Sequence, residues 1–109
     1  LYACASSITY PSATAIYCEA SSPQLIERTS DAICFASQQK FVRTSLDSIE
    51  QHTMWAQRGW EVQIIEENSA DWVVLFRSAG NTIPTYTCKV AFSSKGRVLK
   101  NKSGCGFNK

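Results

Sequence analysis

The sequence predicts an α+β fold in which one helix, early in the chain, packs on an antiparallel β-sheet. Apolar residues recur at helical spacing over residues 22–38, and apolar and polar residues alternate from Trp60 onward. Five cysteines in 109 residues indicate disulfides that supplement a small core. Hydrophobic residues make up 44% of the chain, which suits a single domain over residues 1–109.

The helical element is expected after an N-terminal arm. Residues 1–20 are rich in Ser, Thr and Ala, which favours a hairpin or an irregular arm. Ser21 or Ser22 can cap a helix over residues 22–38, with Pro23 in its first turn. The face that this helix buries is predicted to hold Leu25, Ile26, Thr29, Ala32, Ile33 and Ala36.

Residues 39–59 are mixed and polar, so we expect mostly loop there, with room for a short second helix. Leu46, Ile49 and Trp55 are the apolar residues that would anchor this segment to the core. A tryptophan in such a position is either a core residue or an interface anchor.

Residues 60–100 are predicted to form an antiparallel meander. Its strands cover residues 60–65, 71–76, 86–92 and 97–100. The apolar run from Asp71 suits a strand in the centre of the sheet, and Trp60 and Trp72 are expected in the core. Gly96 stands late in the loop before the last strand, where it can supply a positive φ.

The five cysteines are Cys4, Cys18, Cys34, Cys88 and Cys105. Zinc binding is the rival of disulfides, but no C-x-x-C pair is present and the single histidine, His52, cannot complete a finger. We therefore expect no metal and no cofactor. The odd number leaves either one buried thiol or an intermolecular pairing.

No run of residues approaches the length of a membrane span, so no membrane association is expected. The chain opens abruptly at Leu1, without the basic and apolar pattern of a signal peptide. We expect that a secretion signal has been removed.

Basic residues gather in the last third of the chain. Residues 1–72 hold nine acidic and four basic residues, whereas residues 73–109 hold seven basic residues and no acidic one. Such a segment suits a polyanion, and Tyr86 and Phe107 could stack on bases. The alternative is a solvated sheet face whose lysines keep edge strands apart. The candidate RNA-binding residues are Lys89, Lys95, Arg97, Lys100 and Lys102.

A cysteine before an early helix, a four-strand meander and a last cysteine near the C-terminus resemble the fungal guanyl-specific ribonucleases. The resemblance implies a microbial ribonuclease-like fold. It also implies a disulfide between Cys18 and Cys105, and by analogy with some members a second one between Cys34 and Cys88.

The best local match to that family is His52 seven residues before the Gly59-Trp60 pair. The resemblance gives this histidine an acid–base or phosphate-contacting role, although a surface or structural histidine has the same appearance. Cleavage of RNA needs two proton-transfer groups on opposite sides of the phosphate, and one histidine supplies at most one of them.

The remaining catalytic positions of the family are altered. Glu50 replaces the tyrosine, Asp71 is only a loose candidate for the glutamate base, and Lys89 stands near the arginine position. The second histidine would fall in residues 100–103, which contain none.

We therefore predict a catalytically inactive ribonuclease-like scaffold, a pseudoenzyme. The alternative is an active or weakly active guanyl-type endoribonuclease in which His52 acts with a carboxylate, Asp71 or Glu61.

Tyr2, Ala3 and Cys4 resemble the Y-x-C signature of powdery-mildew effectors with ribonuclease-like folds. This resemblance implies a secreted monomer, delivered to the host plant cell, that acts in virulence or avirulence. Its partner would be a host protein, an intracellular immune receptor included, or RNA. In that family the Y-x-C cysteine bonds near the C-terminus, so Cys4 and Cys18 compete for Cys105.

A protein partner would be bound by loops that the sheet holds in place. The segments with this potential are residues 44–58 and 78–84, with a basic edge at Lys95, Arg97 and Lys100.

Overall fold

A five-stranded antiparallel sheet forms the framework of the protein, with its strands in the order β1-β2-β3-β4-β5. The structure is a computed structural model, and it describes residues 4–18, 25–51, 59–67, 71–79 and 85–108. The strands are β1 (Cys4–Tyr10), β2 (Trp60–Glu67), β3 (Asp71–Ser78), β4 (Thr85–Ser93) and β5 (Gly104–Asn108). The helices are α1 (Ala13–Ile16), α2 (Thr29–Ser37), α3 (Lys40–Glu50) and a 3-10 turn, η1 (Lys100–Lys102).

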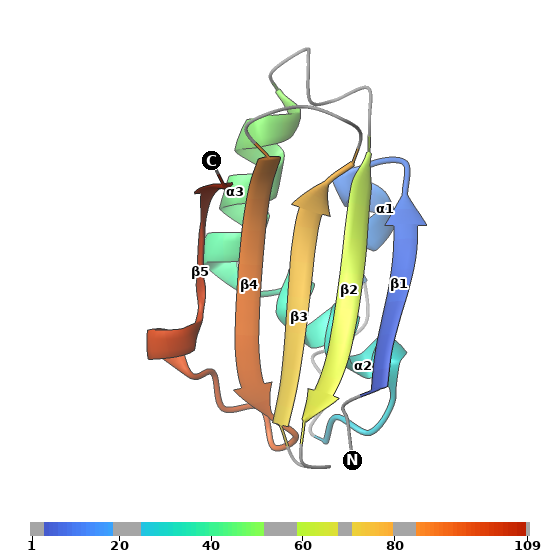
Figure 1. The fold of residues 1–109 in the computed structure, drawn as a ribbon, viewed down its shortest axis with the longest axis vertical. Coiled ribbons are helices and arrows are strands. Elements are labelled where there is room, and N and C mark those ends of the chain that lie inside the picture. Colours follow the sequence, from blue (N-terminus) through green and yellow to red (C-terminus); the bar gives the residue numbers. More distant parts are fainter. Residues whose placement is uncertain (1–3, 19–24, 52–58, 68–70, 80–84, 109) are drawn as a thin grey trace.

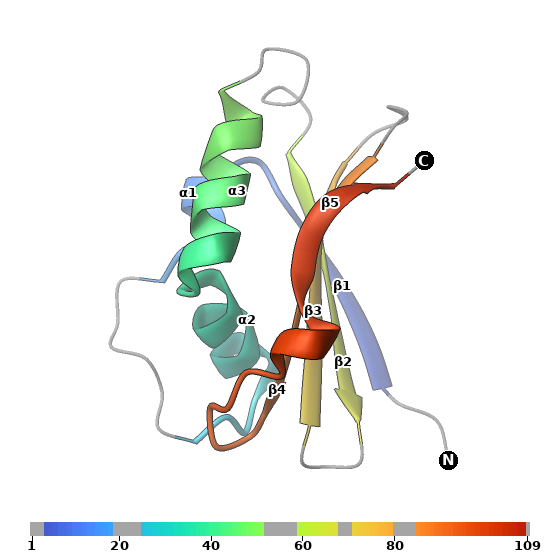
Figure 2. The ribbon, with the colours of Figure 1, turned by 90° about the vertical axis from the view of Figure 1, so that its left-hand side faces the viewer.

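Helices α1, α2 and α3 lie against one face of the sheet, and no described helix covers the other face (Figures 1 and 2). Strand residues alternate between the two faces. Trp60, Val62 and Ile64 of β2 point to the helices and are almost fully buried, as is Trp72 of β3. The predicted α+β class and the placement of Trp60 and Trp72 in the core are confirmed, whereas Trp55 lies outside the described residues.

The prediction of a hairpin or irregular arm in residues 1–20 is wrong for the part that the structure describes. β1 is a full strand that pairs antiparallel with β2, from Cys4 opposite Glu66 to Tyr10 opposite Trp60. A single turn of helix, α1, follows it, with the Ser12 side chain accepting a hydrogen bond from the backbone N–H of Ala15. The arm is ordered because β2 offers it an unpaired edge.

The first long helix, α2, begins later than predicted, at Thr29 rather than near residue 22. The Asp31 carboxylate accepts a hydrogen bond from the backbone N–H of Arg28 and so caps the first turn. Ile26 is buried before the helix starts, because its backbone N–H donates to the carbonyl of Ser94 instead of joining a helical turn. Leu25 is 51% exposed and Thr29 is exposed, so their assignment to the buried face is wrong. Ser21, Ser22 and Pro23 lie outside the described residues.

The expectation of mostly loop in residues 39–59 is wrong for residues 40–50, whereas the second helix for which the prediction left room is present as α3, which spans Lys40–Glu50. Its buried residues are Val42, Leu46 and Ile49, at the i, i+4 and i+7 spacing of one helical face. Only Gln38 and Gln39 separate α2 from α3. The molecule therefore has two long helices on the sheet, where the sequence predicted one.

The prediction of a last strand over residues 97–100 is also wrong. Only Val98 bridges to β4, opposite Phe92, and the chain then turns through η1 before pairing again as β5. The Ser103 hydroxyl holds this bend, because it accepts from the backbone N–H of Ala91 and donates to the carbonyl of Leu99. The positive φ predicted at Gly96 is confirmed at 84°.

The disulfides join Cys18 to Cys34 and Cys88 to Cys105, so both pairings implied by the ribonuclease resemblance are wrong. Cys88 and Cys105 are direct register partners on β4 and β5, with Cα atoms 4.0 Å apart. Cys4 is the fifth cysteine, outside both pairs. The pairing of Cys4 with Cys105 that the effector resemblance implies is also wrong, because Cys105 is bonded to Cys88.

Candidate binding surfaces

The open face of the sheet carries one cross-strand row that contains Lys89. Its members lie opposite one another from β1 to β5 and are Ser7, Gln63, Leu75, Lys89 and Gly104. Lys89 is exposed, and it is the row's one ionisable side chain. No carboxylate stands beside it in this row, although the resemblance places a cation near this position.

The next row of the open face holds an ion pair between Glu61 and Arg77. The Arg77 Nη2 atom lies 2.8 Å from Glu61 Oε1, and both side chains are partly exposed. Arg77 is diagonal to Lys89 across β3 and β4, so the two cations and one carboxylate form a small polar group. Glu61 is the carboxylate of the open face that stands nearest to Lys89 among the described side chains.

Asp71, the sequence candidate for the catalytic base, lies at the end of the sheet. It pairs with Ser93, four residues along β4 from Lys89, which corresponds to about 13 Å. The structure therefore does not bring Asp71 and Lys89 together. His52 lies outside the described residues.

Glu50, which replaces the family's tyrosine, has a structural position. Its Oε2 atom accepts a hydrogen bond from the indole N–H of Trp60 at 2.7 Å and another from the backbone N–H of Ala13. One carboxylate oxygen thus joins the end of α3 to the start of β2 and to α1. These hydrogen bonds hold the Glu50 carboxylate in the helix layer, on the side of the sheet opposite Lys89.

Tyr17 lies at the end of α1 in a second polar cluster of the helix layer. Its hydroxyl donates to Asp47 Oδ1 at 2.7 Å, and the Arg43 guanidinium lies 4.2 Å from the centre of its ring. Burial raises the pKa of Tyr17 well above its usual range, and the hydrogen bond and charge of Asp47 raise it further against the opposing charge of Arg43. This cluster ties α1 to α3 and is a structural element rather than a binding site.

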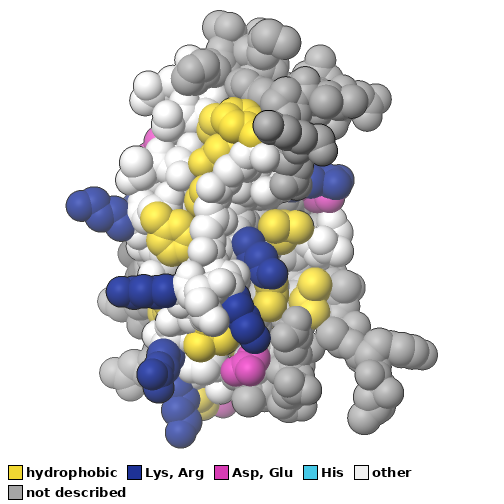
Figure 3. Space-filling model, turned by 60° about the vertical axis from the view of Figure 1, so that its left-hand side comes forward, with side chains coloured by type: hydrophobic (Ala, Val, Ile, Leu, Met, Phe, Trp, Pro, Cys, Tyr) yellow, Lys and Arg dark blue, Asp and Glu magenta, His cyan; other side chains and the backbone are white. Residues whose placement is uncertain are grey.

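The other four candidate RNA-binding residues follow β4 in the chain and are all exposed. Lys95 and Arg97 lie in the loop that passes α2, where Gly96 faces the Phe35 ring, whereas Lys100 and Lys102 lie on η1. Lysine and arginine side chains are spread along this side of the molecule, with apolar patches between them (Figure 3). The structure thus places these cations on one side of the protein without packing them into one cluster.

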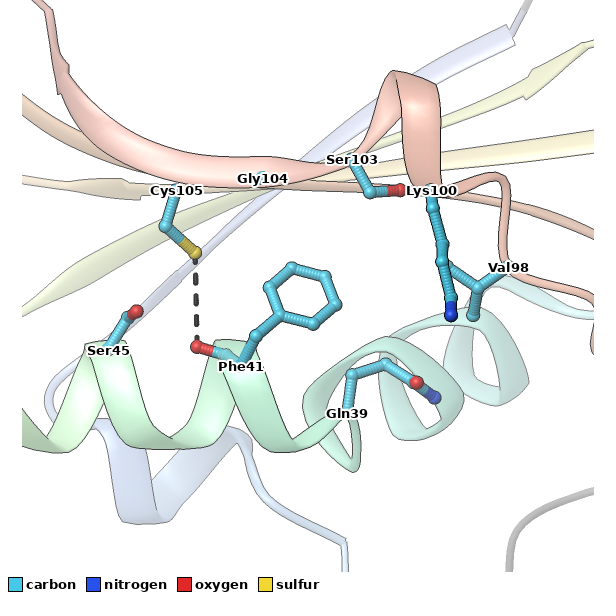
Figure 4. Close-up of a pocket in the computed structure, with 8 residues that line it drawn as sticks. All are labelled: Gln39, Phe41, Ser45, Val98, Lys100, Ser103, Gly104 and Cys105. Atoms are coloured by element: carbon cyan, nitrogen blue, oxygen red, sulfur yellow. Dashed lines mark hydrogen bonds between the residues drawn. The ribbon is translucent and has the colours of Figure 1, made fainter.

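A groove runs between α3 and the C-terminal strand (Figure 4). We call it the α3–β5 groove, and its cavity is about 590 Å³. Its lining residues are Gln39, Phe41, Ser45, Val98, Lys100, Ser103, Gly104 and Cys105. The sequence analysis named Lys100 and a segment that includes Ser45 as candidates, but it did not bring them together, because it expected at most a short helix before residue 59 and no strand β5.

The side chains of the α3–β5 groove converge from both walls. The Phe41 ring stands up from α3 into the gap, while Lys100 reaches from η1 past Val98 toward the helix (Figure 4). The Sγ atom of Cys105 lies 4.0 Å from the Phe41 carbonyl oxygen, a packing contact because a disulfide sulfur has no hydrogen to donate. A second, more open hollow of about 630 Å³ continues over the outer surface of α3 and adds Lys40 and Thr44 to the lining.

Comparison with known proteins found no match to a family model, a curated protein or a solved structure. Within the described segments, no helix is both long and apolar enough to cross a membrane. The same segments contain no cluster of three His, Cys, Asp or Glu side chains that could hold a metal ion. The function has therefore to be inferred from the surfaces described above.

Proposed function

We propose that this protein is a secreted, ribonuclease-like effector of the powdery-mildew type, which acts in the host plant cell by binding a host protein rather than by cleaving RNA. The observation that carries the proposal is the composition of the Lys89 row. The cation near the family's arginine position has Leu75 and Gln63 as its neighbours across the strands, where an acid–base reaction on phosphate would need a titratable group.

The positions of the carboxylates near this face also support a protein that does not cleave RNA. Glu61 is held in an ion pair by Arg77, which satisfies one of its oxygens. Asp71 lies two rows away, and Glu50 is engaged with Trp60 inside the helix layer. Together with a single histidine in the whole sequence, these positions leave acid–base catalysis without a complete set of groups.

Cleavage of labelled RNA by the purified, oxidised protein tests this proposal. We expect no cleavage above the level of a no-protein control, and no difference between the wild type and the variants His52→Ala and Glu61→Gln. Cleavage that either substitution abolishes would contradict the proposal and identify the chain as a ribonuclease. Glu61→Gln tests the carboxylate nearest to Lys89, and Asp71→Asn tests the other carboxylate candidate, at the end of the sheet.

RNA binding without cleavage is a second candidate function, favoured by the exposed cations along one side of the molecule. Contacts to phosphate release counterions, so the affinity for RNA would fall steeply as salt rises. The affinity for a host protein that binds through an apolar anchor would change little with salt concentration. Titration of a single-stranded RNA oligonucleotide at two salt concentrations separates these modes of binding.

A further inference from the structure

We propose that the α3–β5 groove binds an extended peptide segment of the partner, one that carries an acidic residue next to an apolar residue. The inference rests on the proposed function, because it names the chemistry of the partner that such a binding protein would take. Three features of the groove support it: an apolar floor, a positive wall and an open strand edge.

The floor of the groove is apolar and includes an aromatic side chain that is exposed to solvent. Phe41 is 36% exposed, although its α3 neighbours Val42 and Leu46 are fully buried. Val98 and the Cys88–Cys105 disulfide extend this apolar surface on the side of the groove opposite α3. Aromatic residues in pockets are the typical anchors of protein interfaces, because an apolar side chain of the partner removes their surface from water.

The charge of the groove is of one sign. Among the described side chains that line the groove and its continuation over α3, Lys40 and Lys100 are charged and none is a carboxylate. In the described part of the chain, both ion pairs are made by arginines, Arg28 with Asp31 and Arg77 with Glu61. The two lysines therefore present uncompensated charge beside an apolar floor, which complements an acidic side chain that follows an apolar one.

The upper wall of the groove is the outermost strand. β5 is last in the strand order, and within the described residues no further strand pairs with it. Proteins usually protect such an edge with charged side chains or proline, but Gly104, Cys105 and Gly106 supply neither. A Cβ added at Gly104 or Gly106 would meet no atom within 4 Å, so the face of β5 on which these two residues lie is uncrowded. An extended peptide can add to such an edge by backbone hydrogen bonds while its side chains enter the groove.

Selection from a phage-displayed library of random peptides tests the proposal without knowledge of the partner. We expect the enriched peptides to pair an apolar with an acidic residue. Their synthetic, fluorescently labelled forms should bind the wild type at least about tenfold more tightly than the variants Phe41→Ala and Lys100→Glu. Lys95→Glu is the matched control, because it makes the same charge change on an exposed loop, and its affinity should stay within about twofold.

The outcomes separate this proposal from its alternatives. Because Phe41 and Lys100 are exposed, both variants should fold, which unchanged circular dichroism and thermal unfolding would verify. No enrichment, enrichment of basic peptides, or equal affinity for the wild type and Phe41→Ala would overturn the proposal. Loss of binding of a single-stranded RNA oligonucleotide in Phe41→Ala and Lys100→Glu, with retention in Lys95→Glu, would assign the groove to nucleic acid instead.

Failure of the proposed function has a different signature. RNA cleavage that depends on His52 would refute the proposal that the protein binds a host protein without cleaving RNA. The affinity of the selected peptides would still test the groove proposal. Peptide binding without cleavage supports both inferences. If the protein shows neither peptide binding nor RNA cleavage, the groove proposal is overturned, and the binding function would belong to other surfaces.

Discussion

Single side chains connect the layers of this protein, and Glu50 is the clearest case. Its carboxylate lies where α3 ends, and it accepts hydrogen bonds from the Trp60 indole and from the backbone of Ala13. Trp60 is only 2% exposed, so water cannot replace the carboxylate as the acceptor for its N–H. Glu50 therefore contributes to folding.

Replacement of Glu50 by alanine should lower the free energy of unfolding by about 2–4 kcal/mol, because two buried donors lose their acceptor. Glu50→Gln keeps an acceptor oxygen and should cost roughly half as much. Chemical denaturation followed by tryptophan fluorescence measures both values. A Glu50→Ala variant as stable as the wild type would show that these hydrogen bonds make no net contribution to the free energy of unfolding.

At the scale of elements, Tyr17 joins α1 to α3. Its hydroxyl donates to Asp47 and to the carbonyl of Arg43, and its ring lies under the Arg43 guanidinium. Burial, followed by the hydrogen bond and charge of Asp47, favours the neutral phenol against the opposing charge of Arg43, which is why the pKa of Tyr17 is raised above the ordinary value of 10.0. The contribution of Tyr17 to stability is therefore fully present below pH 10.0, and it is lost as the pH rises above that value.

The sign of this effect gives a prediction for alkaline pH. Above pH 10.0 the unfolded tyrosine ionises while the folded one stays protonated, so the stability conferred by Tyr17 must decline. Tyr17→Phe should cost about 0.5–1.5 kcal/mol at neutral pH, and this difference should shrink toward about pH 11. Urea unfolding across this range, with Cys4→Ser in both proteins to prevent thiol–disulfide exchange, measures it. A pH-independent difference would contradict the assignment.

The elements that the sequence predicted well are those whose pattern matches their environment. Trp60, Val62 and Ile64 alternate because one face of β2 is buried and the other is open, so β2, β3 and β4 were recognisable. β5 was missed because glycines at 104 and 106 have low strand propensity, and the strand forms only through its pairing with β4.

α3 was predicted only as a possible short helix within a loop, for a different reason. Val42, Leu46 and Ile49 carry the helical spacing, but polar residues dominate the rest of the segment and hid it. The start of α2 could not be located either, because a contact with Ser94, distant in sequence, extends the chain at Ile26.

At the scale of the whole molecule, each disulfide closes a short loop, with sequence separations of 16 and 17 residues. Each such loop adds about 3 kcal/mol of stability in the chain-entropy model. One disulfide fastens α2 to the segment after α1, and the other fastens β5 to β4. Neither links the N-terminal strand to the rest of the protein.

The two disulfides use four of the five cysteines, so we expect one free thiol per chain. A thiol assay on the unreduced, denatured protein should find a single reactive group, and its loss in Cys4→Ser should identify that group as Cys4. Mass spectrometry of the unreduced digest should recover the Cys18–Cys34 and Cys88–Cys105 peptides. A peptide that joins Cys4 to Cys105 would contradict the structure and restore the pairing of the effector resemblance.

The candidate site was only partly accessible from the sequence. The excess of basic residues after residue 72 indicated the correct third of the chain, and it includes Lys100 of the α3–β5 groove. Phe41 was not suspected, because it approaches Lys100 only when α3 packs beside β5. A site made by two elements far apart in sequence leaves no local pattern.

The order of the strands also determines how the protein can be handled. The chain enters the sheet at β1 and leaves it at β5, so its two ends emerge at opposite edges (Figure 1). A fusion partner or surface anchor placed before β1 stands away from α3 and β5. One placed directly after β5 would crowd them. N-terminal attachment is therefore the geometry of choice for capture and display experiments.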